Sequence, residues 1–407
     1  MCTWLVVESI GHFSRNRSNV YTCFMDMKKA FDLVKHGLLF KKLKEREVPP
    51  IFIRLLIVMY MSQVAKVRWD GTLSEAFSVL NGVKQGAVLS AILFCIYIDD
   101  LIKKLRKNRD GCWINNEYMG IIVYADDIAL LSPTMDGLRN MINTCSSYAK
   151  SHNLKFSTND NPTKSKTKCM AFLRQNRKLD ELVLDGKPLP WVSSVKHLGT
   201  TITNAFGGRL DQDLLEKRAQ YIAKNNELNQ EFFYMHQKTK IWMNNVYNTS
   251  FYGAPLWDMF SENFKRLEKT WNVSIRKMLS IPRNSHRYFL EPLSETPHIS
   301  KSLWNRFVRF VLNIENGKKM VLRRMLDVIR NDVRSVTGRN LRCIKLKTEE
   351  LKLENVDVYK LPYKEVPKGE SWRLPLAREI LDTKNGDLST NISKEQTDDL
   401  AEYIFGS

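Results

Sequence analysis

Residues 121–131 read Ile-Ile-Val-Tyr-Ala-Asp-Asp-Ile-Ala-Leu-Leu, so two apolar runs flank a pair of acids, Asp126 and Asp127. The wider segment 118–132 predicts a β-hairpin that carries the two acids near its tip. A lone pair of aspartates is most often a solvated turn. Here the apolar flanks point the other way, because carboxylates close to buried surface are costly unless something pairs with them. Both acids are therefore candidate site residues.

A third acid stands upstream, in Phe24-Met25-Asp26-Met27-Lys28-Lys29-Ala30-Phe31-Asp32. Residues 20–26 predict a strand, so Asp26 would lie at the strand end, where a helix N-cap is the alternative interpretation. Three carboxylates brought together repel one another unless a cation joins them. Mg²⁺ takes oxygen ligands, and two such ions about 3.5–4 Å apart can activate a 3′-hydroxyl and stabilise a pyrophosphate leaving group. The acids thus predict in-line phosphoryl transfer.

A third segment, Asn81-Gly82-Val83-Lys84-Gln85-Gly86-Ala87-Val88-Leu89-Ser90, lies between the other two. Gly86 permits close backbone approach to a base or sugar, and the amide of Gln85 offers both a donor and an acceptor. The alternative interpretation is a polar loop that caps a helix at Ser90. Alone, this segment indicates little about function.

Together and in this order, the three segments resemble motifs A, B and C of reverse transcriptases. Their residue sequences are most similar to those of the non-LTR (LINE-type) retrotransposon family. The similarity continues along the chain. Residues 156–172 resemble motif D, residues 196–199 resemble motif E (the primer grip), and residues 252–257 and 276–282 resemble the thumb region of that family.

The resemblance implies roles for matching residues. Asp26, Asp126 and Asp127 would be catalytic and would ligate two Mg²⁺ ions, with Mn²⁺ as an alternative. Phe31 falls at the steric-gate position that excludes a ribose 2′-hydroxyl. Further residues would contact the incoming nucleotide, the template or the pyrophosphate: Gln85, Gly86, Tyr124, and either Lys164 or Lys166. Lys196, in the primer grip, would contact nucleic acid.

The expected fold class is α+β: a right-hand polymerase palm, built as a mixed sheet with flanking helices, followed by a mostly helical thumb and C-terminal region. The resemblance and the change in pattern after residues 207–208 predict three parts. These are partial fingers and palm over 1–205, a helical thumb-like region over 206–316, and a basic extension over 317–407. Helical spacing predicts helices over residues 28–44, 51–61, 90–107, 137–152, 210–248, 264–279, 302–313 and 394–405.

The chain is strongly basic, with 63 Lys and Arg against 44 Asp and Glu and a net charge of +19. Such a balance favours a polyanionic partner, although a basic protein without one is the plainer interpretation. Residues 318–347 concentrate the charge. We expect this run, with Arg323, Arg324, Arg330 and Arg334, to contact phosphates, whereas a solvated surface helix is the usual explanation of a charge run.

Seven cysteines without a C-x-x-C pair indicate a reduced, intracellular chain without a zinc knuckle. The N-terminal apolar run is too short for a signal peptide, and residues 87–98 are too short to span a bilayer. We therefore expect a protein of the nucleus or cytoplasm with no membrane partner and no targeting signal. The oligomeric state is left open by the sequence.

The leading interpretation is an RNA-directed DNA polymerase that adds deoxynucleotides to a primer 3′-hydroxyl, with an RNA template, a DNA primer and deoxynucleoside triphosphates as partners. Motif A begins near residue 24. Most of the family's fingers and its endonuclease have no counterpart in this sequence, so we expect a truncated form. Two alternatives remain: an inactive relic that only binds nucleic acid, and a protein similar to group II intron maturases.

Overall fold

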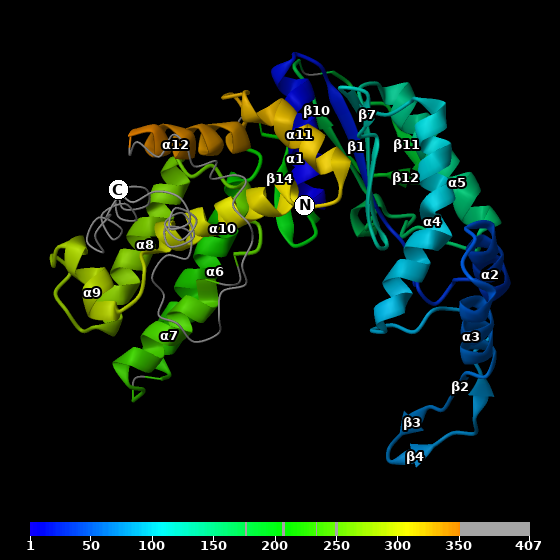
Figure 1. Cartoon of the computed structure of the whole chain (residues 1–407), viewed down its shortest axis with the longest axis horizontal. Coiled ribbons are helices and arrows are strands. Elements are labelled where there is room, and N and C mark those ends of the chain that lie inside the picture. The colour runs from blue at the N-terminus through cyan, green and yellow to red at the C-terminus, as the bar shows by residue number, and fades with distance from the viewer. Residues whose placement is uncertain (176, 206–207, 233, 249–250, 351–407) are drawn as a thin grey trace, which may run out of the picture. The chain divides into compact units, whose positions relative to one another are not determined.

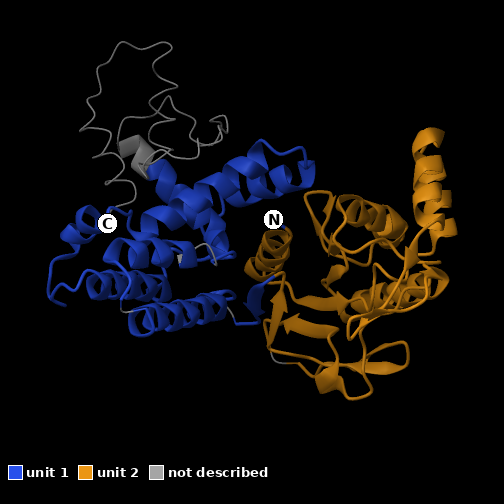
Figure 2. Ribbon diagram, turned by 90° about the horizontal axis from the view of Figure 1, so that it is seen from below, with its two compact units in different colours: residues 1, 199–407 blue, residues 2–198 orange. Residues whose placement is uncertain are grey.

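The computed structural model describes residues 1–350 except 176, 206–207, 233 and 249–250 (Figure 1). The chain divides into two compact units (Figure 2). Residues 2–198 form one, here called the sheet unit. Residue 1 and the described residues from 199 onward form the other, called the helical unit. The predicted helix over 394–405 lies outside the described residues, and the threefold division at 205 and 316 stays a prediction.

The sheet unit is built on a four-stranded antiparallel sheet of order β10-β1-β9-β8. The strands are β1 (Val20–Asp26), β8 (Ile121–Tyr124), β9 (Asp127–Ser132) and β10 (Lys168–Phe172). β1 is central, and its β-branched and aromatic residues suit a strand that is buried on both faces. The predicted strand and hairpin are confirmed, and the mixed helix and sheet content confirms the α+β class.

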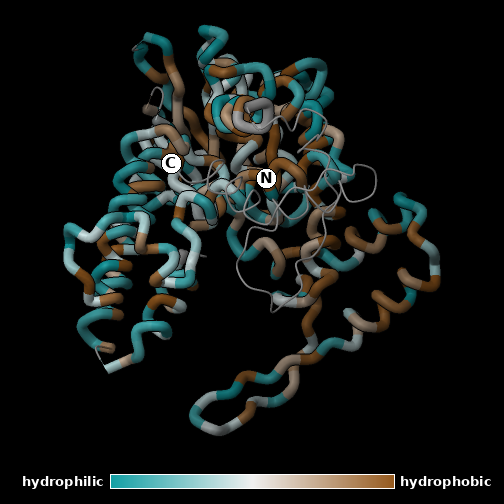
Figure 3. The backbone as a smooth tube through the Cα atoms, turned by 60° about the vertical axis from the view of Figure 1, so that its left-hand side comes forward, coloured by the Kyte–Doolittle hydropathy of each residue, from teal (hydrophilic) through white to brown (hydrophobic). Residues whose placement is uncertain are grey.

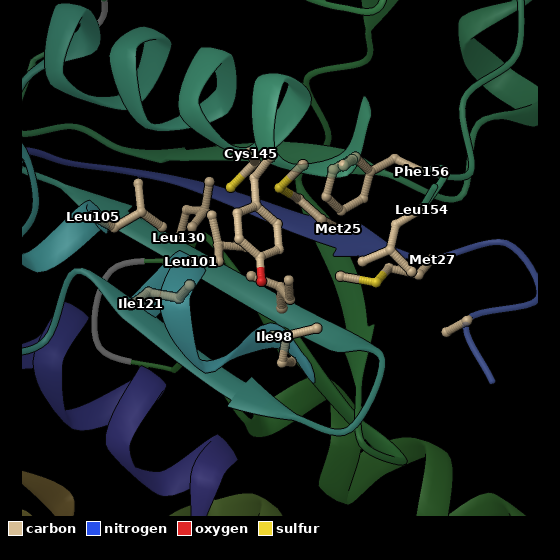
Figure 4. Close-up of a cluster of buried hydrophobic side chains, with 14 of the residues drawn as sticks. Met25, Met27, Ile98, Leu101, Leu105, Ile121, Leu130, Cys145, Leu154 and Phe156 are labelled. Atoms are coloured by element: carbon tan, nitrogen blue, oxygen red, sulfur yellow. The ribbon is translucent and has the colours of Figure 1, made fainter. Parts of the chain in front are cut away.

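Alternation along the strands divides their side chains between two faces. Met25 and Leu130 pack into a buried cluster with side chains of α4 (Val88–Asn108) and α5 (Met135–Ser151) (Figure 4). On the other side, α1 (Cys2–Arg15) contacts β1, β8 and β9 and buries Trp4, Val6 and Ile10. The sheet is therefore covered on both faces, which holds the end of β1 in a fixed position.

Two other sequence predictions needed correction. The helix expected over 28–44 begins only at His36, because residues 28–34 form turns whose backbone groups bond to other segments. Residues 195–203 also have the sequence pattern of a single strand, but they form a pair, β13 (Ser194–His197) and β14 (Thr200–Thr203), joined by Leu198 and Gly199. Both joining residues have positive φ (47° and 78°), as a two-residue hairpin turn requires.

An apolar arm projects from the sheet unit (Figure 3). It comprises α3 (Pro50–Met61) and four two-residue strands, β2 (Val64–Ala65), β3 (Arg68–Trp69), β4 (Thr72–Leu73) and β5 (Phe77–Ser78), which pair as β2-β5 and β3-β4. The arm confirms the helix predicted over 51–61. Many of its large apolar side chains are exposed, among them Trp69, at 82%. Apolar side chains of the first turn of α4 are also exposed, among them Val88, at 88%.

The remaining elements of the sheet unit connect these parts. They are α2 (His36–Glu45), β6 (Trp113–Ile114), β7 (Glu117–Tyr118), η1 (Pro162–Lys164), β11 (Leu182–Leu184) and β12 (Lys187–Leu189). Lys42 on α2 is buried and pairs with Asp100 on α4, and its ammonium lies 3.3 Å from the Tyr148 hydroxyl on α5. This network ties three helices together on one face of the sheet.

The helical unit contains α6 (Asp211–Gln230), α7 (Gln237–Asn248), η2 (Ala254–Leu256), α8 (Glu262–Met278), η3 (Arg287–Phe289), α9 (Leu290–Ser294), α10 (Ile299–Glu315), α11 (Met320–Arg330) and α12 (Val336–Glu350). The long helix expected over 210–248 is therefore two helices. The helices expected over 264–279 and 302–313 are confirmed, each with slightly different bounds.

Buried Asp213 organises the start of the helical unit. Its carboxylate accepts hydrogen bonds from the Thr201 backbone N–H at 3.0 Å and from the Trp257 indole N–H at 2.9 Å. Gly253 passes close by, and a Cβ there would lie 3.0 Å from the same carboxylate. The segment 252–257, noted in the sequence for its family resemblance, thus has a structural role here. Among the described helices, none is long and apolar enough to cross a membrane.

Candidate active site

The sheet register brings the acids of two distant segments together. Asp26, the last residue of β1, is paired directly with Asp127, the first residue of β9. Residues directly opposite in an antiparallel pair have Cα atoms about 4.5–5.5 Å apart and side chains on the same face. Asp126 lies one residue outside β9, in the hairpin turn. The three predicted acids therefore lie at the same end of the sheet, where β1 ends and β9 begins. Asp127 is the cross-strand partner of Asp26.

The hairpin turn itself is strained. Tyr124 pairs with Asp127, which leaves Ala125 and Asp126 as the two turn residues. Ala125 has a φ of 53°, in the left-handed region, where a residue with a Cβ pays roughly 1–2 kcal/mol. Such strain persists where the surrounding structure fixes the backbone, which is common at functional sites. The side chain of Tyr124 is exposed beside the acids.

The electrostatics of the turn fit a cation site. Burial, together with the nearby charges of Asp126 and Asp26, raises the pKa of Asp127 above its ordinary value. The charges of Asp26 and Asp126 thus lie close enough to oppose the ionisation of Asp127. Among the described residues, no three His, Cys, Asp or Glu side chains form a group that could hold a metal ion by themselves. The donor set still fits Mg²⁺, which usually takes one or two carboxylates and completes its shell with water and substrate phosphates.

The segment expected to resemble motif D lies against the end of β1. The Ser157 backbone N–H donates to the Asp26 carbonyl at 2.7 Å, and the Thr167 hydroxyl accepts from the Asp26 N–H at 3.4 Å. Between them, the Lys166 ammonium lies 3.8 Å from the Asp26 carboxylate. Lys164, in η1, is exposed and has no ion pair among the described residues. Of the two candidate lysines, Lys166 is the one beside the acids.

The segment that resembles motif B is joined to motif A through backbone and side-chain contacts. Val83 N–H donates to the Phe31 carbonyl at 2.8 Å, and the Gln85 amide donates to the Asp32 carboxylate at 3.0 Å. Gly82 has a φ of 94°, and a Cβ there would lie 3.0 Å from the Asp32 backbone. Gly86 has a φ of 82° and open space around it. The loop therefore needs glycine at both positions, for different reasons.

Phe31 is half-buried and faces the core as well as the loop. Its ring lies 5.1 Å from the ring of Phe94 on α4, and Phe31 packs against the buried cluster of the sheet unit. This is the ordinary packing of a phenylalanine on an apolar surface. Its steric-gate role stays a prediction.

The predicted nucleic-acid contacts have different surroundings. Lys196 on β13 is exposed, whereas the neighbouring His197 is buried and bonded to Thr3 at 3.1 Å. On α11, Arg323 and Arg324 are exposed. Two others pair with acids of the helical unit: Arg330 with Glu315, and Arg334 with Asp332 at 3.2 Å. The basic run is thus partly occupied by internal ion pairs.

Sequence reasoning missed three residues that shape the site. Asp32 is exposed and binds Gln85, and no pattern in the sequence singles it out for that contact. Gly82 and Thr167 were not singled out. The Asn81-Gly82 pair is a turn signal that favours positive φ, so Gly82 could have been found. Nothing in the sequence marks Thr167, because its partner lies in a strand more than a hundred residues earlier.

Comparisons with known proteins relate part of this chain to one protein family. Residues 4–202 match the family model described as reverse transcriptase (RNA-dependent DNA polymerase). The chain is 30% identical over 120 residues to a retrovirus-related Pol polyprotein from the type-1 retrotransposable element R2 of Nasonia vitripennis. It is 29% identical over 133 residues to the corresponding polyprotein of the type-2 element R2DM of Drosophila melanogaster.

These relatives are much longer proteins. The matches cover 30% and 33% of this chain but only 12% of each relative. Among solved structures, apo telomerase from Candida tropicalis matches 86% of this chain and 56% of that chain, with 12% identity and a TM-score of 0.41. The family match over residues 4–202 is the more specific of these similarities.

Proposed function

We propose, from the premise that residues 4–202 form a reverse transcriptase domain, that this chain is the polymerase part of a non-LTR retrotransposon protein. Its reaction would add a deoxynucleotide to the 3′-hydroxyl of a DNA primer on an RNA template and release pyrophosphate. The sheet unit would act as the palm with part of the fingers, and the helical unit as the thumb with a basic extension. The named relatives favour a retrotransposon origin over an intron maturase.

The observation that carries the proposal is the pairing of Asp26 with Asp127, with Asp126 in the adjoining turn. We infer that Asp26 and the two turn acids would hold two Mg²⁺ ions, or Mn²⁺ in their place. When bound, such ions lower the pKa of the attacking hydroxyl and stabilise the leaving oxygen. The protein's own part is to fix the carboxylates at one end of the sheet. There the raised pKa of Asp127 shows that its charge is disfavoured, and a neighbouring cation would relieve that cost.

Lys166 is the proposed partner of the pyrophosphate. Its ammonium lies 3.8 Å from Asp26, and the side chain is 73% exposed, so it can turn toward a phosphate of a bound nucleotide. There it would neutralise or protonate the leaving group. Lys164 stays a second candidate that its position supports less well.

Several residues around the acids would position the nucleotide and template. Gln85 and Gly86 would contact the incoming base or sugar, because the loop is exposed and Gly86 leaves open space beside it. Tyr124 would lie against the primer end, next to the acids. Phe31 would limit the space near the sugar, and its packing on Phe94 would hold the ring in place.

The test separates metal binding from catalysis. Primer extension on poly(rA) with an oligo(dT) primer is expected to need Mg²⁺ or Mn²⁺ and to be lost in Asp126→Asn. Binding of Mn²⁺ by electron paramagnetic resonance is expected to weaken in the same variant. Asp136→Asn, an exposed acid at the start of α5, is the control and should change neither. Undiminished metal binding and synthesis in Asp126→Asn would remove the assignment.

A further inference from the structure

An exposed aromatic pair lies between α8 and α9 of the helical unit. Tyr288 and Phe289, both in η3, are 64% and 54% exposed, and Leu293 beside them is 55% exposed. Large rings are usually buried, since each can remove 150–250 Å² of surface from water. Exposed apolar surface rimmed by polar residues is one sign of a contact surface.

The geometry of the pair leaves ring faces open. The two ring centroids lie 5.8 Å apart, with the ring planes at 80° to one another. In such an edge-to-face pair the edge of one ring covers part of one face of the other, and the pair itself leaves the remaining faces uncovered. A planar group can therefore stack on at least one ring while the other supports its edge.

The backbone that carries the rings is held by specific bonds. The Arg276 guanidinium donates to the Ser285 carbonyl at 3.0 Å through Nε and at 2.7 Å through Nη2. The His286 ring accepts from the Tyr288 N–H at 3.3 Å, and Leu290 is fully buried directly after the pair. The rings are thus presented by an ordered segment, which lowers the entropy cost of binding.

The segment that carries the rings is rich in positive charge. Residues 276–293 contain Arg276, Lys277, Arg283 and Arg287 against a single acid, Glu291. Glu291 is already engaged, because its carboxylate accepts from the Lys301 ammonium and the His298 N–H, both at 2.9 Å. Arg283 is exposed and makes no ion pair among the described residues. Arg287 is also exposed, although it lies near enough to half-buried Glu268 to stabilise its charge.

We propose that residues 283–289 bind single-stranded nucleic acid. Bases would stack on Tyr288 and Phe289, and the backbone phosphates would pair with Arg283 and Arg287. Exposed rings interleaved with arginines suit single strands, because the bases of a duplex are stacked and offer no free faces. The inference concerns a surface of the helical unit and does not depend on catalysis at Asp26 and the turn acids.

Binding of the full chain to fluorescently labelled oligo(rU) and oligo(dT) tests the proposal. Alanine at Tyr288 or at Phe289 is expected to weaken the affinity about five-fold or more, the effect typical of removing one stacked base. Tyr252→Ala is the matched control. That ring is 70% exposed in the same unit, but the segment 251–259 contains no Lys or Arg. Its affinity should be unchanged, and circular dichroism should confirm that all three variants are folded.

The arginines give a second readout. Replacing Arg283 and Arg287 by Gln should flatten the plot of log affinity against log salt by about 0.7 for each phosphate that is no longer bound. Photocrosslinking with 5-iodouridine in the oligonucleotide should modify Tyr288 or Phe289, as located by mass spectrometry. This readout identifies the site even if the strand also binds elsewhere on the chain.

Two results would overturn the proposal. One is that the chain binds the oligonucleotides, that alanine at Tyr288 or at Phe289 leaves the affinity unchanged, and that no crosslink forms at residues 283–289. The other is a change of oligomeric state, by light scattering, in Tyr288→Ala without a change of affinity, which would assign the patch to self-association. The crosslink at residues 283–289 and primer extension by Asp126→Asn are separate readouts, so loss of extension in that variant tests only the polymerase proposal.

Discussion

The amide of Gln85 lies 3.0 Å from the carboxylate of Asp32, a hydrogen bond between residues that are 53 positions apart. It joins the loop at 81–90 to the turn that follows β1, on the approach to the acids. Both side chains are exposed, so the bond contributes little to stability in itself. Its value would lie in holding the loop in one position.

A double-mutant cycle tests that connection. Gln85→Ala and Asp32→Ala are each expected to raise the KM for deoxynucleotide, because either change frees the loop. The KM of the double variant should not exceed that of the more impaired single variant, which corresponds to a coupling energy of about 0.5–1 kcal/mol. Additive effects would mean that the two residues act separately. Asp136→Ala, on α5, provides the control.

Substitution of the two loop glycines by alanine should lower the stability of the protein by different amounts. Gly86→Ala should lose about 1 kcal/mol of stability, because the residue has positive φ but open space around it. Gly82→Ala should lose about 2 kcal/mol or more, since its Cβ would also meet the Asp32 backbone. Urea denaturation of both variants gives the comparison. Equal losses would contradict the close approach at Gly82.

The raised pKa of Asp127 implies that its charge lowers the stability of the protein without metal, although the same charge would bind Mg²⁺. Its folded-state pKa is raised, so the stability linked to its proton is present below the unfolded value of 3.8 and is lost as pH rises through the folded value. Asp127→Asn should therefore be more stable than the wild type at pH 7 without metal, and the difference should vanish below pH 3.8. Mg²⁺ should raise the melting temperature of the wild type more than that of the variant. Calorimetry at both pH values measures each effect.

Buried His197 predicts loss of stability in mild acid. Burial lowers the pKa of this histidine from 6.5 to about 4. A depressed folded pKa means that stability is present above pH 6.5 and is lost as pH falls toward 4. At pH 5 the loss should reach about 2 kcal/mol. His197→Gln should show a flatter dependence between pH 6.5 and 5 in urea denaturation. An unchanged slope would show that other groups control acid stability.

The arginines of the basic run are of two kinds, exposed ones and ones in ion pairs, and their substitution should have different effects. Arg323→Gln should reduce the salt slope for duplex binding by nearly one unit, because this side chain is exposed on α11. Arg330→Gln should instead destabilise the helical unit, since it leaves Glu315, a largely buried acid, without its ion pair. Affinity at several salt concentrations and urea denaturation distinguish the two. A flattened slope only in Arg330→Gln would reverse the assignment.

Local pattern was enough to identify the candidate acids and most long elements. β1, the hairpin at 121–132 and α5 were predictable because alternation and helical spacing are properties of a few neighbouring residues. The identity of the cross-strand partner was not. Opposition of Asp26 to Asp127 depends on the register of β1 against β9, which the packing of both faces decides.

The failures have tertiary causes. Residues 28–34 have helical spacing, but the Lys28 N–H bonds to the Lys155 carbonyl and the Phe31 carbonyl accepts from Val83, so the helix starts later. Residues 195–203 look like one strand because Leu198 is a poor turn former, yet it adopts positive φ. The aromatic pair at 288–289 was missed because exposure of a ring cannot be read from composition.

The central place of β1 in the sheet also has a consequence during synthesis. Its neighbours are β9, at residues 127–132, and β10, at residues 168–172, so neither side of β1 can pair until the ribosome has made about a hundred further residues or more. An apolar strand that emerges early and waits for late partners is a place where nascent chains associate wrongly. We expect slow, chaperone-dependent maturation, in which the acids meet only as the sheet unit nears completion.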